Sequence, residues 1–221
     1  MRRRVVMTGM GAVTPVGHSI ASTFAALLEG VSGVDRITHF DARTFPTTFA
    51  AEVKNFDLAK FVPDAGRFAK CGSNTVFALA AARMALDDAD FRGVDRSRVG
   101  VYLGAGEGCE DFDTVISAAG MASADGRAVD HGRFAREAVA MLDGEREAEL
   151  EMNTSAGRLA EEYELLGPNY TCLTACAASA QALGEAAEMI RFGDADAMLA
   201  GGAHSMIHPF GVTGFNLLTA L

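Results

Sequence analysis

The sequence lacks any long uninterrupted run of apolar residues. A membrane-spanning helix needs about 20 of them in succession. The N-terminal MRRRVVMTGMGAV has positive charges, but the apolar run after them is short and broken by glycines, unlike the apolar centre of a secretory signal. We therefore predict a cytoplasmic protein that does not insert into a membrane.

Positive charge is also scarce. The chain has 19 Lys and Arg residues against 29 Asp and Glu residues, which gives a formal net charge of -10. Binding to a phosphate backbone needs clustered Lys and Arg side chains. The charge balance therefore argues against nucleic acid as a partner.

Cysteines are few, and their spacing fits no familiar metal or redox motif. The four are Cys71, Cys109, Cys172 and Cys176. None forms the Cys-x-x-Cys pair that is typical of zinc and redox sites, and four scattered cysteines in this context indicate no disulfide framework. We expect no bound metal.

The glycine-rich N-terminal turn falls short of a dinucleotide fingerprint. It reads Gly9-x-Gly11-x-x-Thr14, so the third glycine is missing, and Pro15 stands where a phosphate-binding helix would already be running. We therefore expect no nicotinamide, and no other cofactor is indicated.

The overall composition is that of an ordinary α/β protein. The chain has 221 residues, 49% of them hydrophobic and 22% charged, with 24 glycines, enough for one large domain with a substantial core. Apolar strand patterns alternate with helical ones, which predicts a mixed or parallel sheet with helices on both faces. The strands are expected at residues 3–7, 48–53 and 99–103, and the helices at 19–29, 67–89 and 153–165, with a charged helical insertion within 111–150 and an irregular cap at 35–63.

The rest of the chain is organised around residues 167–202, GPNYTCLTACAASAQALGEAAEMIRFGDADAMLAGG. The pattern predicts a strand at 170–173, a tight turn at Cys176, a nearly all-apolar helix from 177 to 192 that Gly193 ends, and a strand at 197–200. A helix of that composition is expected inside a layered fold.

Cys176 is the candidate nucleophile. The free N–H groups and the positive dipole at the start of the following helix favour a thiolate. The small neighbours Ala175, Ala177 and Ala178 leave room for a substrate carbonyl, and the backbone N–H of Cys176 is suited to a developing oxyanion. The alternative is that Cys176 is a small buried apolar residue, as most free cysteines are.

Several stretches in order along the chain resemble the β-ketoacyl-acyl-carrier-protein synthases, most closely the elongating type II form. They are PNYTCLTACAASAQALGEAAEMIRFGDADAMLAGGAH around Cys176, RRVVMTGMGAVTPVG near the N-terminus, RVGVYLGAG at residues 98–106 and Pro209-Phe210-Gly211. The resemblance covers nearly the whole chain. It implies a thiolase-like layered α/β fold, of which residues 1–221 form the N-terminal lobe, incomplete at its C-terminal end.

The resemblance also implies an activity and a set of partners. These enzymes join an acyl-enzyme thioester to malonyl-acyl-carrier protein by decarboxylative Claisen condensation in fatty-acid synthesis, and they work as homodimers. Cys176 matches the acyl-accepting cysteine. Gly106, Glu107 and Gly108 match a loop beside the acyl pocket, where Glu107 replaces a residue that is normally apolar.

An acidic chain that binds an acidic carrier protein needs a local patch of cations. Lys60, Arg67 and Lys70 are the nearest candidates for carrier docking. The alternative is that they are ordinary solvated surface charges.

The family's two enolate-stabilising histidines and its lysine lie further along the sequence and are not found here. His204 and His208 lack the family's His-Gly-Thr context and are better explained as loop histidines, and we assign none of the five histidines to catalysis. We therefore expect that the chain alone does not complete the condensation. A polyketide or coenzyme A-dependent condensing enzyme, and a non-catalytic subunit that pairs with an active synthase, are the alternatives.

Overall fold

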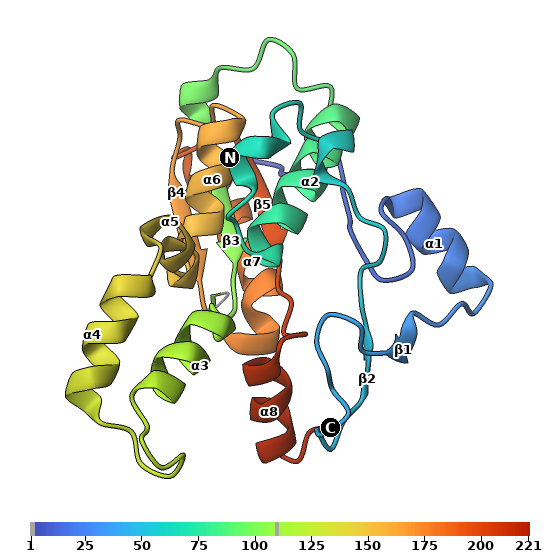
Figure 1. Cartoon of the computed structure of the whole chain (residues 1–221). Helices are drawn as coiled ribbons and strands as arrows, with labels where there is room; N and C mark the ends of the chain where they lie inside the picture. The colour runs from blue at the N-terminus through green and yellow to red at the C-terminus, as the bar shows by residue number, and fades with distance from the viewer. Residues whose placement is uncertain (1–2, 109–110) are drawn as a thin grey trace.

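A three-stranded parallel sheet forms the centre of the protein (Figure 1). The computed structural model describes residues 3–108 and 111–221. The strand order is β4–β3–β5, with β3 at Val99–Gly104, β4 at Asn169–Cys172 and β5 at Ala197–Gly202. A separate antiparallel ribbon pairs β1 (Val34–Arg36) with β2 (Phe49–Ala51).

Helices surround the sheet and continue beyond one of its ends (Figure 1). Their bounds are α1 Ile20–Leu28, α2 Ser73–Asp88, α3 Phe112–Met121, α4 His131–Met141, α5 Gly144–Glu147, α6 Thr154–Glu162, α7 Ala178–Phe192 and α8 Pro209–Leu217. Short 3-10 helices are η1 Leu58–Lys60, η2 Ala65–Phe68, η3 Arg96–Arg98, η4 Ala148–Leu150 and η5 Ala175–Ala177.

The side chains of β3 show which helices cover which face of the sheet. Successive strand residues point to opposite faces. Val99, Val101 and Leu103 are buried in one cluster with residues of α2 and α6, whereas Tyr102 packs with Cys172 and two alanines of α7. Helices α2 and α6 therefore cover one face and α7 covers the other, as the sequence predicted for an α/β fold.

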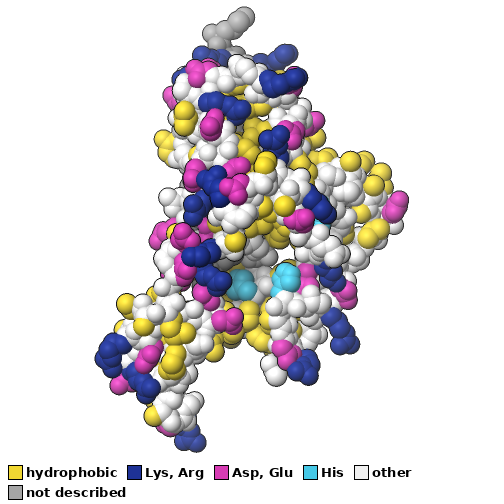
Figure 2. All heavy atoms as spheres, turned by 45° about the horizontal axis from the view of Figure 1, so that its top comes forward, with side chains coloured by type: hydrophobic (Ala, Val, Ile, Leu, Met, Phe, Trp, Pro, Cys, Tyr) yellow, Lys and Arg dark blue, Asp and Glu magenta, His cyan; other side chains and the backbone are white. Residues whose placement is uncertain are grey.

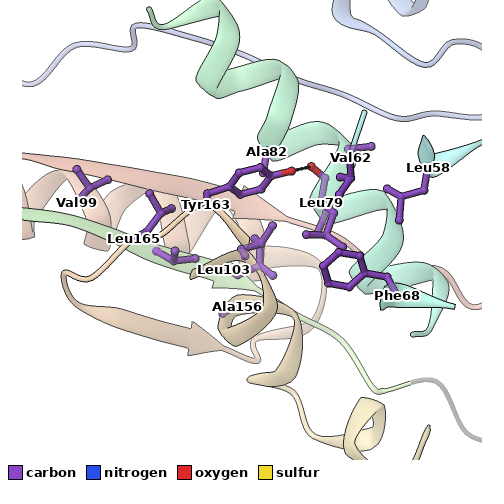
Figure 3. Packing of buried hydrophobic residues seen from close by; sticks show 14 residues of the cluster. Leu58, Val62, Phe68, Leu79, Ala82, Val99, Leu103, Ala156, Tyr163 and Leu165 are labelled. Atoms are coloured by element: carbon purple, nitrogen blue, oxygen red, sulfur yellow. Dashed lines mark hydrogen bonds between the residues drawn. The ribbon is translucent and has the colours of Figure 1, made fainter. Parts of the chain in front are cut away.

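The main core lies between the sheet and the α2–α6 pair (Figure 3). Leu79 and Leu159 are almost completely buried there. The Tyr163 hydroxyl, at the end of α6, donates a hydrogen bond of 2.7 Å to the Leu79 carbonyl oxygen. A buried hydroxyl needs such a partner, so this bond fixes how α6 is aligned along α2.

The predicted buried strand at residues 3–7 is wrong. This segment is not hydrogen bonded into the sheet, and Val6 and Met7 are 61% and 70% exposed. The segment is held instead through Arg3, which contacts Asp196, and through glycines that lie against α2. A Cβ at Gly11 would lie 1.9 Å from the Ala81 carbonyl oxygen, so glycine here serves close packing on a helix.

Residues 34–63 form an irregular cap whose only strand pairing is the β1–β2 ribbon. The strand predicted at 48–53 is present as the shorter β2. The Glu52 side chain is fully buried and accepts hydrogen bonds from the Thr38 backbone N–H at 2.8 Å, the Thr38 hydroxyl at 2.6 Å and the His39 backbone N–H at 3.0 Å. One carboxylate thus ties the two sides of the cap together.

The helical predictions are correct in kind and differ at the boundaries. The helix predicted at 67–89 is divided into η2 and α2, because Gly72 is the N-cap of α2. Helix α7 ends at Gly193, whose φ of 89° lies in the left-handed region that favours glycine. The charged segment 111–150 forms α3, α4, α5 and η4, and Figure 1 shows α3 and α4 extending side by side from the body.

Helix α7 is only half buried, which corrects the expectation of a helix enclosed on all sides. Its buried residues are Ala178, Ala182 and Ala186, which face the sheet. On other faces Leu183 is 45% exposed and Phe192 is 79% exposed, because no second layer formed by the described residues covers α7. None of the described helices has the length and apolar character needed to cross a membrane.

The close approach of β3 to α7 leads to a prediction about stability. A Cβ at Gly104 would lie 2.4 Å from the Ala178 carbonyl carbon, a backbone atom that cannot give way without moving α7. We expect Gly104→Ala to lower the free energy of unfolding by about 1–3 kcal/mol. The measurement is denaturant unfolding followed by circular dichroism.

The matched control is Gly184→Ala within α7, where an added Cβ meets nothing within 4 Å. Alanine is favoured over glycine inside a helix by about 0.5–1 kcal/mol, so this variant should be more stable than the parent. Equal effects of the two substitutions would contradict the packing argument.

The buried Glu52 carboxylate predicts a loss of stability in acid. Burial disfavours its charge, but the hydrogen bonds from Thr38 and His39 outweigh burial and hold the pKa of Glu52 below its usual 4.5. The stabilisation is complete above the ordinary glutamate pKa and is lost as pH falls through the lower folded value. Glu52→Gln should cost about 1–3 kcal/mol at pH 7.

The deficit of Glu52→Gln relative to the parent should then shrink in unfolding titrations taken below pH 4.5. Glu29→Gln, at the exposed C-cap of α1, is the control and should leave the free energy of unfolding at pH 7 close to that of the parent. A Glu52→Gln deficit that stays constant down to pH 2.5 would show that ionisation of Glu52 does not contribute.

Candidate active site

Cys176 lies in the turn that connects β4 to α7. It is the middle residue of η5, two residues before α7 begins, and it is exposed. The strand, turn and helix predicted around it are therefore all present. An exposed thiol at the start of a 15-residue helix has the placement of a nucleophile, and the alternative of a buried apolar cysteine does not hold for Cys176 in this chain.

The turn is sharp because of the residue before the thiol. Ala175 has a φ of 50°, in the left-handed region that L-residues seldom adopt. The Thr174 hydroxyl donates a 2.9 Å hydrogen bond to the Gln181 side-chain oxygen, which ties the turn to the first part of α7. A strained backbone held in this way is common where a side chain is presented for chemistry.

The ends of all three strands meet beside this turn. Gly104, Cys172 and Gly202 are in register at the carboxyl ends of β3, β4 and β5. A Cβ at Gly104 would collide with Ala178, and one at Gly202 would lie 2.9 Å from Ser179 Cβ. The loops after β3 and β5 therefore begin against the first turn of α7. This is the end of the sheet formed by the carboxyl ends of the strands, where α/β proteins bind their ligands.

Two other described cysteines are placed where they cannot react readily. Cys172 is 9% exposed, and its thiol donates to the Ala178 carbonyl oxygen at 3.2 Å. Burial, together with the neighbouring Glu149 carboxylate, raises the pKa of the Cys71 thiol to about 12. The prediction on Cys109 lies outside the described residues.

The loop after β3 carries Gly106, Glu107 and Gly108, and it contacts the loop after β5. The Glu107 carboxylate lies 3.5 Å from His204 Nε2, and its side chain is 69% exposed. The His204 ring lies so close to Gly106 that an added Cβ would be 2.2 Å from Nε2. The Glu107 carboxylate and the His204 imidazole thus meet at the same end of the sheet as Cys176. We assign His204 no catalytic role.

Asn74, in the first turn of α2, joins the same two loops. Its side-chain NH2 donates to the Glu107 carbonyl oxygen at 3.2 Å, and its side-chain oxygen accepts from the Ser205 backbone N–H at 2.6 Å. This role has no signal in the sequence, because an asparagine near a helix start is ordinarily explained as a cap. The Glu107–His204 contact was missed for a similar reason, since the two residues are 97 positions apart.

His208 is placed as the sequence predicted, as a loop histidine. Its Nδ1 accepts a hydrogen bond of 3.3 Å from the Gly211 N–H, so it caps the start of α8. Within residues 3–108 and 111–221, no group of three or more His, Cys, Asp or Glu side chains is arranged to hold a metal ion.

The candidate docking cations do not form a patch of unpaired charge. Arg67 contacts Glu161 at 2.9 Å and Glu162 at 3.2 Å, and Lys70 contacts Asp143 at 2.8 Å and Glu145 at 2.9 Å. Figure 2 shows Lys and Arg side chains interspersed with Asp and Glu on the visible face. Lys60 is exposed in η1. Carrier docking at Lys60, Arg67 and Lys70 therefore stays a prediction, and at Arg67 and Lys70 a carrier would compete with carboxylates of this chain.

The comparisons with known proteins agree with this fold. The model of the family described as "Beta-ketoacyl synthase, N-terminal domain" matches residues 2–221, and the chain belongs to this family. A curated relative, 3-oxoacyl-[acyl-carrier-protein] synthase 2 of Coxiella burnetii, is 36% identical over 227 residues, which cover 100% of this chain and 50% of the relative. The chain spans about half the length of the curated relatives it matches.

Solved structures show the same architecture. The ishigamide ketosynthase/chain length factor matches with a TM-score of 0.76 and 27% identity, covering 100% of this chain and 52% of that one. A type II polyketide ketosynthase, solved with its acyl carrier protein and a hexaketide, matches with a TM-score of 0.75 and 28% identity over 100% of this chain and 50% of that one. The predicted thiolase-like α/β class is confirmed.

The different surroundings of the cysteines predict selective alkylation. In native protein at pH 8, iodoacetamide should modify exposed Cys176 at least about tenfold faster than Cys71 or Cys172, because only a thiolate reacts and the raised pKa keeps Cys71 protonated. Peptide mass spectrometry of a time course gives the rate at each site.

Labelling in urea is the control, since all three sites should then react at similar rates. Native labelling of Cys71 as fast as that of Cys176 would contradict the described burial of the Cys71 thiol.

Proposed function

We propose that this chain carries the acyl-accepting half of a condensing enzyme, with Cys176 as the nucleophile. The Cys176 thiolate attacks the carbonyl carbon of an acyl thioester, and the bond from that carbon to the carrier sulfur breaks. The carrier leaves as a thiolate, which takes up the proton that Cys176 released, and an acyl-Cys176 thioester remains. The observation that carries the proposal is the exposed thiol at the strand–turn–helix junction of a β-ketoacyl synthase domain.

The second half of the reaction needs hydrogen-bond donors for an enolate oxygen, and we assign this role to none of the histidines of this chain. Loss of CO2 from a malonyl thioester leaves an enolate, which attacks acyl-Cys176 and releases the Cys176 thiolate. Developing charge on the enolate oxygen requires fixed hydrogen-bond donors. We propose that the rest of a protein about twice this length provides them, and that residues 1–221 are one lobe of its two-lobed fold.

The proposed substrates are acyl and malonyl thioesters of acyl carrier protein in fatty-acid synthesis. This choice is supported by curated relatives named 3-oxoacyl-[acyl-carrier-protein] synthase 2. The runner-up is polyketide condensation, which is supported by the similarity to polyketide ketosynthase structures. A non-catalytic subunit is disfavoured, because such a subunit would not need an exposed thiol at this turn.

A homodimer is also proposed. Strand β4 is at the edge of the sheet, so no described strand pairs with its outer side, and Tyr170 and Leu173 beside this edge are 53% and 45% exposed. Exposed edge strands with apolar side chains favour pairing with another chain. A cytoplasmic location stays a prediction.

Acylation of the thiol tests the proposal directly. Incubation of the chain with the octanoyl thioester of N-acetylcysteamine should add one octanoyl group, which intact mass spectrometry detects and peptide mapping places on Cys176. Cys176→Ala should abolish the modification, because it removes the attacking atom.

Cys172→Ala is the matched control, since Cys172 is buried in the same segment, and it should still be acylated. Addition of an octanoyl group to Cys176→Ala would contradict the assignment of Cys176 as the nucleophile. Comparing octanoyl-carrier protein with octanoyl-coenzyme A as donor then separates the carrier-dependent enzyme from a coenzyme A-dependent relative.

A further inference from the structure

Once the sheet ends, the loops after β3 and β5 are no longer paired with each other as strands, although the Ala105 N–H in the first loop still donates to the Cys172 carbonyl oxygen at 3.0 Å. The β3–β5 pairing stops at the Gly104 and Gly202 pair. Beyond it, the two loops meet where His204 packs on Gly106 and where His204 Nε2 lies 3.5 Å from the Glu107 carboxylate. The Glu107 side chain in that pair is largely exposed, and exposed ion pairs contribute little.

Asn74 supplies the connection that the strands no longer make. It is buried at 8% exposure, and its amide bonds the Glu107 carbonyl oxygen on one loop and the Ser205 N–H on the other. The first bond needs a donor and the second an acceptor, so only one orientation of the amide satisfies both. Aspartate has no donor for Glu107, and alanine has neither group.

The anchor itself is rigid. Asn74 belongs to the first turn of α2, and the next residue, Thr75, is bonded through its hydroxyl to Glu149 at 2.6 Å and to Ser155 at 2.8 Å. These partners lie on η4 and α6, and the backbone of Glu149 also lies against Gly108 in the loop after β3. The packing of α2 therefore fixes the position of Asn74, and the two hydrogen bonds of its amide fix the loops relative to α2.

We propose that Asn74 is a positioning residue for acylation of Cys176, which holds the two loops at a fixed spacing beside the thiol. The inference rests on the proposed function, because it concerns how the acyl thioester is held during attack on its carbonyl carbon. Asn74 acts through the loops and not on the reacting atoms. Its loss should leave the reactivity of the thiol intact while weakening productive binding of the acyl group.

The experiment compares two reagents on the same protein variants. Acylation of Cys176 by octanoyl-N-acetylcysteamine is measured over a range of concentrations, to separate the maximal rate from half-saturation. Alkylation by iodoacetamide measures the thiol alone, since a small reagent does not need the loops. Misplaced positioning groups typically reduce rates by about ten- to a hundredfold.

For Asn74→Ala we expect at least about a tenfold loss of acylation efficiency, mainly through weaker half-saturation, with iodoacetamide alkylation within about twofold of wild type. The acylation efficiency of Asn74→Asp should lie between those of wild type and Asn74→Ala, because aspartate keeps an acceptor for the Ser205 N–H. Thr75→Val is the matched control: it removes the two hydrogen bonds of the Thr75 hydroxyl in the same turn and leaves both Asn74 bonds to the loops in place, and its acylation efficiency should stay within about twofold of wild type.

Hydrogen exchange of the Ser205 amide provides a readout that needs no variant. It should be protected in wild type, because it donates a 2.6 Å bond to the side-chain oxygen of buried Asn74, and it should lose that protection in folded Asn74→Ala, which has no acceptor. An unprotected Ser205 amide in wild type would overturn the inference even if no variant folds.

The possible failures are distinguishable. If wild type is not acylated at Cys176, the proposed function fails and the role of Asn74 falls with it. If wild type is acylated but Asn74→Ala behaves like Thr75→Val, or alkylation falls as much as acylation, only the positioning role is overturned.

Discussion

The structure depends on how closely the ends of β3 and β5 approach the first turn of α7. Two glycines, Gly104 and Gly202, are placed where a side chain would collide with the backbone of Ala178 or the side chain of Ser179. Because they have no Cβ, the sheet edge and the helix start share one small region. The position of Cys176 and the starting points of both flanking loops follow from this contact.

A second constraint is electrostatic and links distant parts of the chain. Helix α2 begins after Gly72, which has no side chain to cap the free backbone N–H groups. The Glu149 carboxylate takes this role from 77 positions away, accepting from the Gly72 N–H at 3.1 Å and from the Thr75 hydroxyl. Negative charge at a helix start is favourable. The segment 111–150, which the sequence predicts to be a charged helical insertion, therefore helps to stabilise the start of α2.

The parts of the fold that were predictable from sequence are those encoded locally. The strand, the turn at Cys176, helix α7 and the stop at Gly193 are adjacent in sequence, and each has its own signal in residue size, periodicity or glycine placement. The same holds for α1, whose Ser19 cap is present and bonded to the Ser22 N–H at 3.1 Å.

The parts that were not predictable depend on partners remote in the chain. Residues 3–7 have a strand-like composition, yet a strand also needs a neighbouring edge to pair with, and the periodicity of one segment does not reveal this. Asn74 is separated from Ser205 by 131 positions, and Glu52 gave no local sign of its three hydrogen bonds to Thr38 and His39. Side-chain bridges of this kind have no repeating pattern and therefore become visible only in three dimensions.

The pairing of Arg67 and Lys70 with carboxylates has a consequence for how this chain meets other molecules. With a net charge of -10 and these two cations already neutralised, the field at a distance from the chain is repulsive to an acidic protein. Dissolved ions shorten the range of that repulsion, to about 10 Å at 0.1 M ionic strength. Encounters between this chain and an acidic carrier protein should therefore become faster as salt is added, the reverse of the usual behaviour of oppositely charged partners.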